Sequence, residues 1–165
     1  MQKDRITIGV MSDTHHSDAA VMRAMLALGD VDAFLHLGDC VEDAEYLQAC
    51  TEAKVYSVAG NCDFYSGIAD ERVVELSGVN IFMTHGHRYS VRDDDDLVLD
   101  RALELGCKVA AYGHTHCPSL EQRRGVWIMN PGSAFRPRGW KVPTCGLIEI
   151  GGGRVVCRLL SLDKL

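Results

Sequence analysis

Short apolar runs alternate with amphipathic segments over the first sixty residues. The runs that fit buried strands cover residues 6–11, 33–37 and 54–58. Ser17 or Asp18 can cap a helix between the first two runs, and its apolar side chains recur near a 3.6-residue period at Val21, Met22, Met25, Leu26 and Leu28. Glu42–Cys50 predicts a second helix. This strand–helix–strand succession predicts parallel strands with right-handed crossovers.

The pattern changes after residue 70, where strands follow one another directly. Arg72–Leu76 and Asn80–Thr84 are joined by Ser77-Gly78-Val79, a turn short enough for a hairpin. The acidic run Asp93–Asp96 begins a third helix that ends near Leu105, and we interpret it as a capped, solvated first turn that favours the helix macrodipole. Further strands are expected at 108–112, 119–123, 126–130, 144–150 and 154–160. Parallel strands early and antiparallel strands late predict two packed sheets flanked by helices, an α/β fold.

Length and composition fit one domain over residues 1–165. The chain is 47% hydrophobic and 24% charged, with 16 Gly and only 4 Pro, which excludes a disordered or collagen-like chain. No apolar run approaches the roughly 18 residues of a membrane span, and the amino end leads into a strand rather than a signal peptide. Seven Cys without regular spacing favour free thiols. We therefore expect a cytoplasmic protein that does not bind membranes.

The charge balance bears on the partners. Seventeen Lys and Arg face 23 Asp and Glu, a formal net charge of −6, so the surface as a whole should repel long polyanions. We expect no general nucleic-acid binding. A small anionic substrate stays open, because a local metal site can override the overall field. Apolar edges in the late strands leave a homodimer or higher homo-oligomer open.

Seven polar side chains follow the predicted strands. They are Asp13, His15, Asp39, Asn61, His85, His114 and His116. Ligands of open α/β sheets bind outside the carboxyl ends of the strands, so these groups can converge on one crevice. Residues two apart in extended backbone point to the same side, which lets Asp13 with His15, and His114 with His116, aim inward together.

Carboxylate, imidazole and amide oxygen together suit borderline divalent metals such as Mn, Fe, Co, Ni or Zn. Seven ligands exceed the need of one catalytic ion and indicate two. Two dications contribute +4 and Asp13 and Asp39 remove two charges, so the pocket keeps about +2 and fits a phosphate group. Taken alone, Asp39 fits a turn and Asn61 a loop. His36, inside an apolar run, is expected to pack or to support a ligand rather than bind metal.

The motifs around these residues resemble, in order, the signature blocks of the calcineurin-like metallophosphoesterases. They are Asp13-Thr14-His15, Gly38-Asp39, Gly60-Asn61-Cys62-Asp63, His85-Gly86-His87 and Gly113-His114-Thr115-His116, with Asn130-Pro131-Gly132-Ser133 later in the chain. The chain is similar in length and motifs to the small bacterial and archaeal phosphodiesterases of that superfamily, the YfcE-like group. The blocks span residues 13–133, most of the domain.

This resemblance implies a four-layer α/β/β/α sandwich with two mixed β-sheets flanked by helices. It also implies two divalent ions per chain: one held by Asp13, His15 and His116, the other by Asn61, His85 and His114, with Asp39 bridging. Manganese is the expected metal, with Fe, Ni, Co or Zn as alternatives. Water or hydroxide held between the ions would attack phosphorus in line with the leaving alkoxide.

Two positions depart from the wider superfamily. Cys62 stands where many members place a His after the Asn, although the YfcE-like group shares the Cys. A thiol is a weak donor with an ordinary pKa near 8.5, which puts general-acid catalysis in doubt and favours substrates with good leaving groups. His87 is the best remaining proton donor, with support of the metal site as its equal alternative. His16 replaces a usual Gly and is expected to point to solvent.

The remaining motifs allow more than one interpretation. Basic side chains cluster near the motifs at Arg88, Arg92, Arg123, Arg124, Arg136, Arg138 and Lys141. One or two could grip a second phosphate or a sugar edge, while most are solvated surface charges. Asn130–Ser133 either lines the pocket with backbone amides or forms a plain structural turn.

The leading interpretation is a hydrolase of small phosphate esters, most simply a phosphodiesterase, with His87, Cys62 and Asn61 as the candidate catalytic residues beside the metal ions. The alternative is a non-catalytic binding or scaffold protein on the same fold, like the retromer subunit that resembles this family. A scaffold has no chemical need for the complete ligand set. Because all seven ligands are present, the sequence favours the enzyme.

Overall fold

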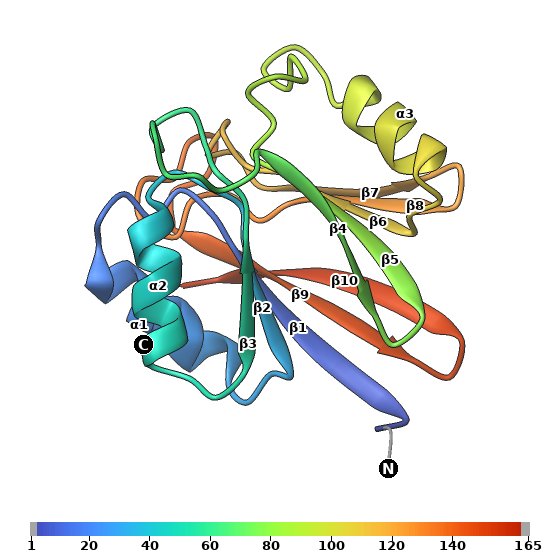
Figure 1. The fold of residues 1–165 in the computed structure, drawn as a ribbon, viewed down its shortest axis with the longest axis horizontal. Coiled ribbons are helices and arrows are strands. Elements are labelled where there is room, and N and C mark those ends of the chain that lie inside the picture. Colours follow the sequence, from blue (N-terminus) through green and yellow to red (C-terminus); the bar gives the residue numbers. More distant parts are fainter. Residues whose placement is uncertain (1–2, 163–165) are drawn as a thin grey trace.

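The computed structural model describes residues 3–162, which form ten strands and three helices (Figure 1). The first sheet has the strand order β10-β9-β1-β2-β3, and the second has the order β4-β5-β6-β8-β7. Figure 1 shows α1 and α2 on the outer side of the first sheet and α3 on the outer side of the second. The chain therefore forms an α/β fold with two mixed sheets between helices, as expected.

Each sheet combines parallel and antiparallel pairs. In the first, the parallel strands are β1 (Arg5–Met11), β2 (Ala33–His36) and β3 (Lys54–Ser57), and β9 (Thr144–Gly151) and β10 (Arg154–Ser161) add antiparallel beyond β1. In the second, the parallel strands are β5 (Val79–Thr84), β6 (Val109–Ala111) and β8 (Val126–Asn130), with β4 (Glu71–Leu76) and β7 (Ser119–Arg123) as antiparallel edges.

The structure has three helices, and the first is capped by a side chain as its sequence allows. They are α1 (Asp18–Leu28), α2 (Val41–Ala49) and α3 (Asp96–Glu104). The Ser17 hydroxyl accepts the Ala20 amide at 3.1 Å and caps α1, as the sequence predicted. No helix within residues 3–162 is long and apolar enough to span a membrane.

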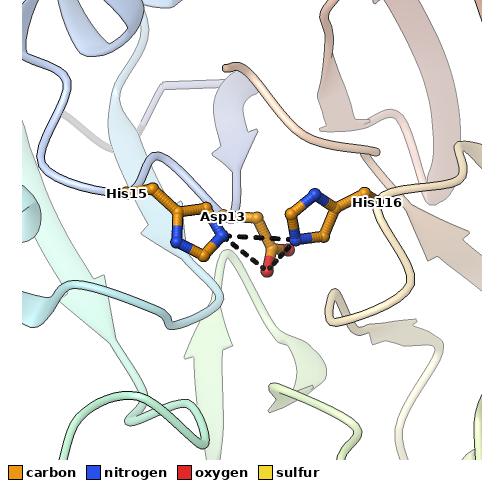
Figure 2. Close-up of side chains that lie close together, drawn as sticks. All are labelled: Asp13, His15 and His116. Carbon is orange, nitrogen blue, oxygen red and sulfur yellow. Dashed lines mark hydrogen bonds and ion pairs between the residues drawn. The ribbon is translucent and has the colours of Figure 1, made fainter. Parts of the chain in front are cut away.

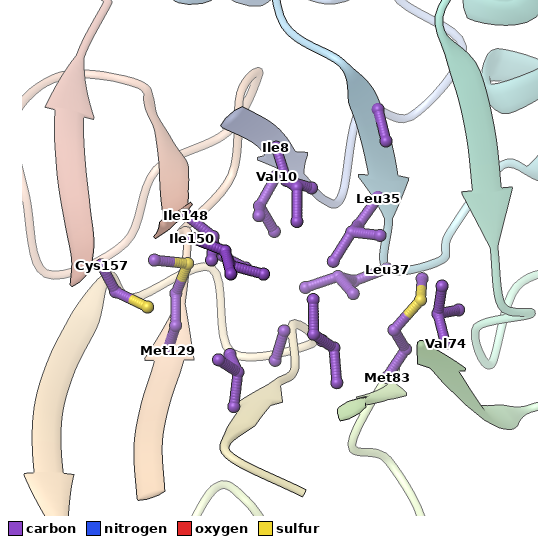
Figure 3. Packing of buried hydrophobic residues seen from close by; sticks show 14 of the residues in the cluster. Ile8, Val10, Leu35, Leu37, Val74, Met83, Met129, Ile148, Ile150 and Cys157 are labelled. Atoms are coloured by element: carbon purple, nitrogen blue, oxygen red, sulfur yellow. The ribbon is translucent and has the colours of Figure 1, made fainter. Parts of the chain in front are cut away.

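The hydrophobic core consists of three clusters of buried side chains, which pack the two sheets and the helices together as a sandwich. Figure 3 shows side chains such as Val10, Leu35, Met83 and Met129 meeting between the two sheets. A second cluster joins α3 to its sheet, and a third joins α1 and α2 to the other. Adjacent strand residues face opposite layers: Leu35 lies between the sheets, whereas Phe34 packs under the helices.

Three local expectations were wrong. Parallel and antiparallel pairs are not segregated along the chain, because the late strands β6 and β8 pair in parallel, β6 with β5 and β8 with β6. The β4–β5 turn is the pair Ser77–Gly78 without Val79; both residues have left-handed φ angles of 51° and 77°, the geometry of a tight two-residue hairpin.

The acidic run is the third correction. The helix α3 begins at Asp96, and Asp95 takes the N-cap position without a side-chain cap bond. Instead, the carboxylates of Asp95 and Asp96 both pair with Arg123 of β7. The run therefore ties the helix to the edge of its sheet rather than serving only as a capped first turn.

Candidate metal centre

The loops that follow the parallel strands bring all seven predicted ligands into one continuous cluster. Asp13 lies beyond β1, Asp39 beyond β2 and Asn61 beyond β3, all in the first sheet. His15 also lies in the loop after β1. The loops after β5 and β6 of the second sheet supply the other three ligands, His85, His114 and His116. The centre is thus built at the strand ends of both sheets.

Asp13 occupies the middle of this cluster and is fully buried. Its Oδ2 accepts hydrogen bonds from the Ser12 hydroxyl at 2.6 Å and the His114 amide at 3.1 Å. Its Oδ1 makes no hydrogen bond to the described residues. Instead, the Nε2 atoms of three imidazoles surround Oδ1, at 3.2 Å for His116, 3.8 Å for His85 and 3.9 Å for His15. Figure 2 shows two of these rings turned toward the carboxylate.

A second group forms around the amide oxygen of Asn61. Asn61 Oδ1 lies 3.0 Å from His85 Nε2 and 2.9 Å from His114 Nδ1. Asp39 Oδ2 lies 3.4 Å from the same His85 nitrogen, while Asp39 Oδ1 accepts the Cys62 amide at 3.0 Å. His85 Nε2 therefore lies close to all three of Asp13, Asp39 and Asn61 and links the two groups of donors.

Backbone carbonyls orient two of the imidazoles. His85 Nδ1 donates to the Leu37 carbonyl, and His116 Nδ1 donates to the Arg136 carbonyl, each at 2.7 Å. Each bond leaves the Nε2 lone pair free to face the centre, which is how metal-binding imidazoles are held. His114 faces the centre through Nδ1 instead, and the Arg92 guanidinium donates to its Nε2 at 3.1 Å.

The charges in the cluster are strongly coupled. Burial alone would raise the pKa of Asp39, but the hydrogen bond and positive charge of His85 outweigh it and hold this pKa below its ordinary value. The pKa of Asp13 is lowered in the same way, against its burial, by His116 and His85. The two carboxylates thus stay ionised in a buried place, where a cation is the natural counter-charge.

The imidazoles divide into two kinds. The Asp13 carboxylate, 3.2 Å from His116 Nε2, raises the pKa of His116, and the carboxylates of Asp39 and Asp13 raise that of His85 against its burial. Burial lowers the pKa of His15, and burial with the charges of His85 and Arg92 lowers the pKa of His114 to about 4. His15 and His114 are therefore neutral near pH 7, the state in which imidazole binds metal.

Left-handed backbone, not extended backbone, aims the paired ligands inward. Asp13, His15, His114 and His116 have φ angles of 55°, 47°, 70° and 60°. We expected extended backbone to point both members of each pair to the same side. Both members do reach the cluster, but the backbone is left-handed, so the expected cause was wrong. Positive φ is uncommon for residues other than Gly and concentrates at functional sites.

Two glycines allow the loops to approach this closely. A Cβ at Gly60 would lie 2.2 Å from Asp39 Oδ1, and a Cβ at Gly113 would lie 2.2 Å from the Ser12 hydroxyl and 2.7 Å from Asp13 Oδ2. No side chain fits at either position without displacing a carboxylate.

Sequence reasoning missed two carboxylates that support the centre. Asp63 Oδ1 accepts the Cys40 and Val41 amides at 2.8 and 2.9 Å, so it caps α2 from a separate loop, and Asp63 Oδ2 accepts the Gly60 amide at 2.7 Å. Asp43 is buried and accepts the Thr14 hydroxyl and, at 3.0 Å, the His16 amide. The sequence offered one signal for these roles: Asp63 is the fourth residue of the motif Gly60-Asn61-Cys62-Asp63. Both roles depend on tertiary contacts, which local sequence patterns do not reveal.

The other singled-out residues lie around this centre. His36 is buried and its Nε2 lies 2.9 Å from the Thr14 hydroxyl, so it supports the loop of Asp13. His16 is exposed. Asn130 and Ser133 are buried and structural: the Asn130 amide donates to the Gly113 carbonyl at 3.1 Å, and the Ser133 hydroxyl donates to the Asp13 carbonyl at 2.8 Å. They hold the two loops in place.

His87 and Cys62 lie at the edge of the centre. The His87 ring centroid is 5.5 Å from that of His85, and its buried Nδ1 has no hydrogen-bond partner among residues 3–162. Burial and the charges of His85 and Arg88 lower the pKa of His87. Burial and the charge of Asp39 raise the pKa of the Cys62 thiol to about 11, so this thiol is neutral near pH 7.

The donor set fits a divalent metal. Asp13 Oδ1 is an orphaned buried carboxylate oxygen, and the surrounding donors are imidazole, carboxylate and amide groups, which suit borderline metals. The ligand atoms of two groups, Asp13 with His15 and His116, and Asp13 with Asp39 and His85, lie within 4.8 Å of one another.

Comparisons with known proteins agree with this geometry. Residues 6–153 match the model of the calcineurin-like phosphoesterase superfamily domain, and the chain belongs to this family. It is 34% identical to a probable metallophosphoesterase of Methanothermobacter thermautotrophicus, over 95% of this chain and 99% of that protein. It is 30% identical to a phosphodiesterase of Methanocaldococcus jannaschii, over 86% of this chain and 92% of that protein. The chain is therefore a hydrolase of phosphoester bonds.

Solved structures share the fold. A predicted phosphoesterase from Streptococcus pneumoniae superposes with a TM-score of 0.82 at 31% identity, covering 96% of this chain and 91% of that chain. Vps29 of Entamoeba histolytica, in a zinc complex, superposes with a TM-score of 0.74 at 22% identity, covering 96% of this chain and all of that chain (100%). The second likeness is one of fold alone.

Proposed function

We propose that this chain is a two-metal phosphodiesterase of small phosphate esters, with manganese as its first candidate metal. The observation that carries the proposal is the unpaired, buried Oδ1 of Asp13 with three imidazole Nε2 atoms within 3.9 Å of it. Burying an ionised carboxylate oxygen without a partner is costly unless a cation binds there.

The two groups of donors assign the ligands. Asp13, His15 and His116 would hold one ion; Asn61, His85 and His114 would hold the other. Asp39 would bridge, because it lies beside His85 and its second oxygen is fixed by the Cys62 amide. Such a pair would supply positive charge to a phosphate ester and would lower the pKa of water, so that hydroxide would be available at neutral pH.

The chain's own residues prepare this site in defined ways. The Leu37 and Arg136 carbonyls fix the rings of His85 and His116, so that little reorganisation is needed when a cation binds. If two dications bind, the carboxylates of Asp13 and Asp39 would offset two of their four charges, and the site would stay positive toward a phosphate. Asn61 contributes a neutral oxygen and its amide nitrogen remains on the side of Cys62, 3.7 Å from the sulfur.

The leaving group receives weak acid assistance in this account. The thiol of Cys62 is neutral, and its high pKa makes it a poor proton donor. Among the described residues His87 makes no hydrogen bond to His85, whose Nδ1 is bonded to the Leu37 carbonyl, so we favour a role toward the substrate over support of that ligand. Because its pKa is lowered, His87 would act near pH 7 as a neutral N–H donor to the leaving oxygen.

Diesters with good leaving groups fit this chemistry better than monoesters of alkyl alcohols. A weak acid cannot protonate a poor leaving alkoxide efficiently. The likeness to a relative named as a phosphodiesterase supports the same preference.

We further propose that residues 1–165 act as one domain in the cytoplasm. Ligands come from both sheets, so neither sheet could form the centre alone. All seven Cys are free thiols, which fits a reducing compartment. A homodimer stays a prediction, and no partner beyond the small ester substrate is proposed.

The second candidate function is a non-catalytic binding protein on the same fold, the fold that the chain shares with Vps29. Hydrolysis of bis(4-nitrophenyl) phosphate and 4-nitrophenyl phosphate, after reconstitution with Mn, Fe, Ni, Co or Zn, separates the two. We expect metal-dependent release of 4-nitrophenol, faster from the diester, and its loss in Asp13→Asn. A protein that binds metal but hydrolyses neither ester would support the binding protein.

A further inference from the structure

Most of the basic side chains singled out in the sequence are already engaged. Arg88 pairs with Asp70 at 2.8 Å, Arg123 pairs with Asp96 at 2.7 Å, and Arg124 lies 3.7 Å from Asp100. Arg92 donates to His114. The exceptions lie together in residues 135–141, Phe-Arg-Pro-Arg-Gly-Trp-Lys, which we call the cationic loop.

The cationic loop carries three charges that nothing in the described structure balances. Arg136, Arg138 and Lys141 are exposed, and none forms an ion pair with a carboxylate of residues 3–162. The segment 131–143 contains no Asp or Glu, although acidic residues outnumber basic ones in the whole chain. The three cations fall within six consecutive residues, and without counter-charges they create a positive local potential that attracts an anion.

The loop is fixed against the metal centre by its backbone. The Arg136 carbonyl accepts from His116 Nδ1 at 2.7 Å, and the Arg138 amide donates to the His116 carbonyl at 2.9 Å. The Ser133 hydroxyl accepts the Arg136 amide at 2.7 Å and donates to the Asp13 carbonyl. The backbone at Arg136 and Arg138 is therefore held directly beside His116, a candidate ligand of the first metal ion.

Arg136 is also partly organised for binding. Its guanidinium lies over the ring of Phe135, 5.1 Å from the centroid, which restricts its rotamers without using its N–H donors. A guanidinium with free donors binds phosphate oxygens in pairs. The adjacent Trp140 is about half exposed.

We propose that the cationic loop is a subsite for a second phosphate of the substrate, with Arg136, Arg138 and Lys141 as specificity-determining residues. This inference rests on the proposed phosphodiesterase activity and narrows its substrate class to diesters that carry a further phosphate group. The scissile phosphate binds at the metal centre, and the second phosphate binds beside His116, where the three cations replace its water contacts.

A matched pair of substrates tests the subsite. Thymidine 5′-(4-nitrophenyl phosphate) and the same ester with a 3′-phosphate differ only in the second anion. For the wild-type enzyme we expect KM to be about tenfold lower for the 3′-phosphorylated ester, the size of two or three exposed charge pairs, with the difference shrinking as ionic strength rises.

The variants locate the effect. In Arg136→Gln/Arg138→Gln/Lys141→Gln, the KM ratio of the two esters should fall to within about twofold of one. The bonds to His116 come from the backbone, so these exposed substitutions leave them in place. Arg154→Gln is the control. Arg154 is exposed at the start of β10, opposite Gly151 of β9, at the end of the sheet away from the ligand loops, so this variant should keep the tenfold ratio.

The outcomes separate this inference from the activity on which it rests. Hydrolysis of both esters with equal KM overturns the subsite and leaves the phosphodiesterase in place; a tenfold ratio that persists in the triple variant overturns its assignment to the loop. If neither ester is hydrolysed, the proposed function fails.

Calorimetry then still decides on the subsite: thymidine 3′,5′-bisphosphate should bind wild-type protein about tenfold more tightly than thymidine 5′-monophosphate, and the triple variant should bind them equally. Equal binding by the wild type overturns the inference.

Discussion

The Nε2 atoms of His15 and His116 lie 3.2 Å apart, although 101 positions separate the two residues in the chain. Ligand atoms about 2.1 Å from one ion, at tetrahedral or octahedral angles, are roughly 3.0–3.4 Å from each other. The spacing of these two nitrogens, and the 3.2 Å from His116 to Asp13 Oδ1, therefore match a metal site before any ion is considered.

Metal binding should stabilise the fold. An ion that binds only the folded chain adds about 2.7 kcal/mol to the free energy of unfolding at one hundred times its Kd. We expect Mn to raise the Tm of EDTA-treated protein by several degrees, as measured by scanning calorimetry. His116→Ala should lose most of this increase, and an increase of the same size in His116→Ala would contradict the assignment.

Asp39→Asn should nearly abolish turnover, because a neutral amide cannot serve two cations as a carboxylate does. We expect kcat to fall by about two orders of magnitude or more, with less metal retained per chain by elemental analysis. Asp93→Asn, an exposed change outside the centre, is the control. Near-normal kcat in Asp39→Asn would show that this carboxylate does not bridge.

Cys62→Ser should change kcat by less than about threefold. The pKa of this thiol is raised to about 11, so neither thiolate chemistry nor proton donation near neutral pH depends on it. The pH–rate profile between pH 6 and 9 should keep its shape in the variant. A hundredfold loss of kcat would assign a direct catalytic role to Cys62.

The affinity for metal should fall as the solution becomes more acidic. In the metal-free protein the pKa of His116, and that of His85 despite its burial, lie above the ordinary value, and a metal takes only the deprotonated rings. Below those pKa values each displaced proton weakens binding by about tenfold per pH unit. Calorimetric titrations in two buffers of different ionisation enthalpy measure the protons released. Affinity that stays constant from pH 8 to pH 6 would contradict this coupling.

Asp63→Ala should destabilise the protein by about 1–2 kcal/mol, because two amides at the start of α2 lose their acceptor. Urea unfolding measures the change. Asp93→Ala, an exposed control without a side-chain partner among the described residues, should stay within about 0.5 kcal/mol of the wild type. Equal midpoints for the two variants would refute the capping role.

The sequence predicted two sheets flanked by helices and the polar residues that gather at the centre, because both follow from local patterns. Apolar runs marked the strands, and polar residues after them marked the edge where loops meet. It did not predict that β9 would pair with β1, since that pairing depends on contacts between residues more than a hundred positions apart.

The missed features of the site have the same origin. The left-handed backbone of His15 and His116 is imposed by surrounding contacts and contradicts the intrinsic preference of these residues. Asp63 looked like part of a motif, yet its function as the cap of α2 appears only when the loop after β3 lies beside that helix. The engagement of most basic residues, which singles out the cationic loop, likewise required the tertiary structure.

Anomalous diffraction from manganese-loaded crystals tests the central claim most directly. We expect two peaks per chain, one within about 2.3 Å of Asp13, His15 and His116 donors and one within the same distance of Asn61, His85 and His114 donors, with Asp39 between them. A fully loaded crystal with these side chains turned away from each other, or with the metal bound elsewhere, would contradict the account.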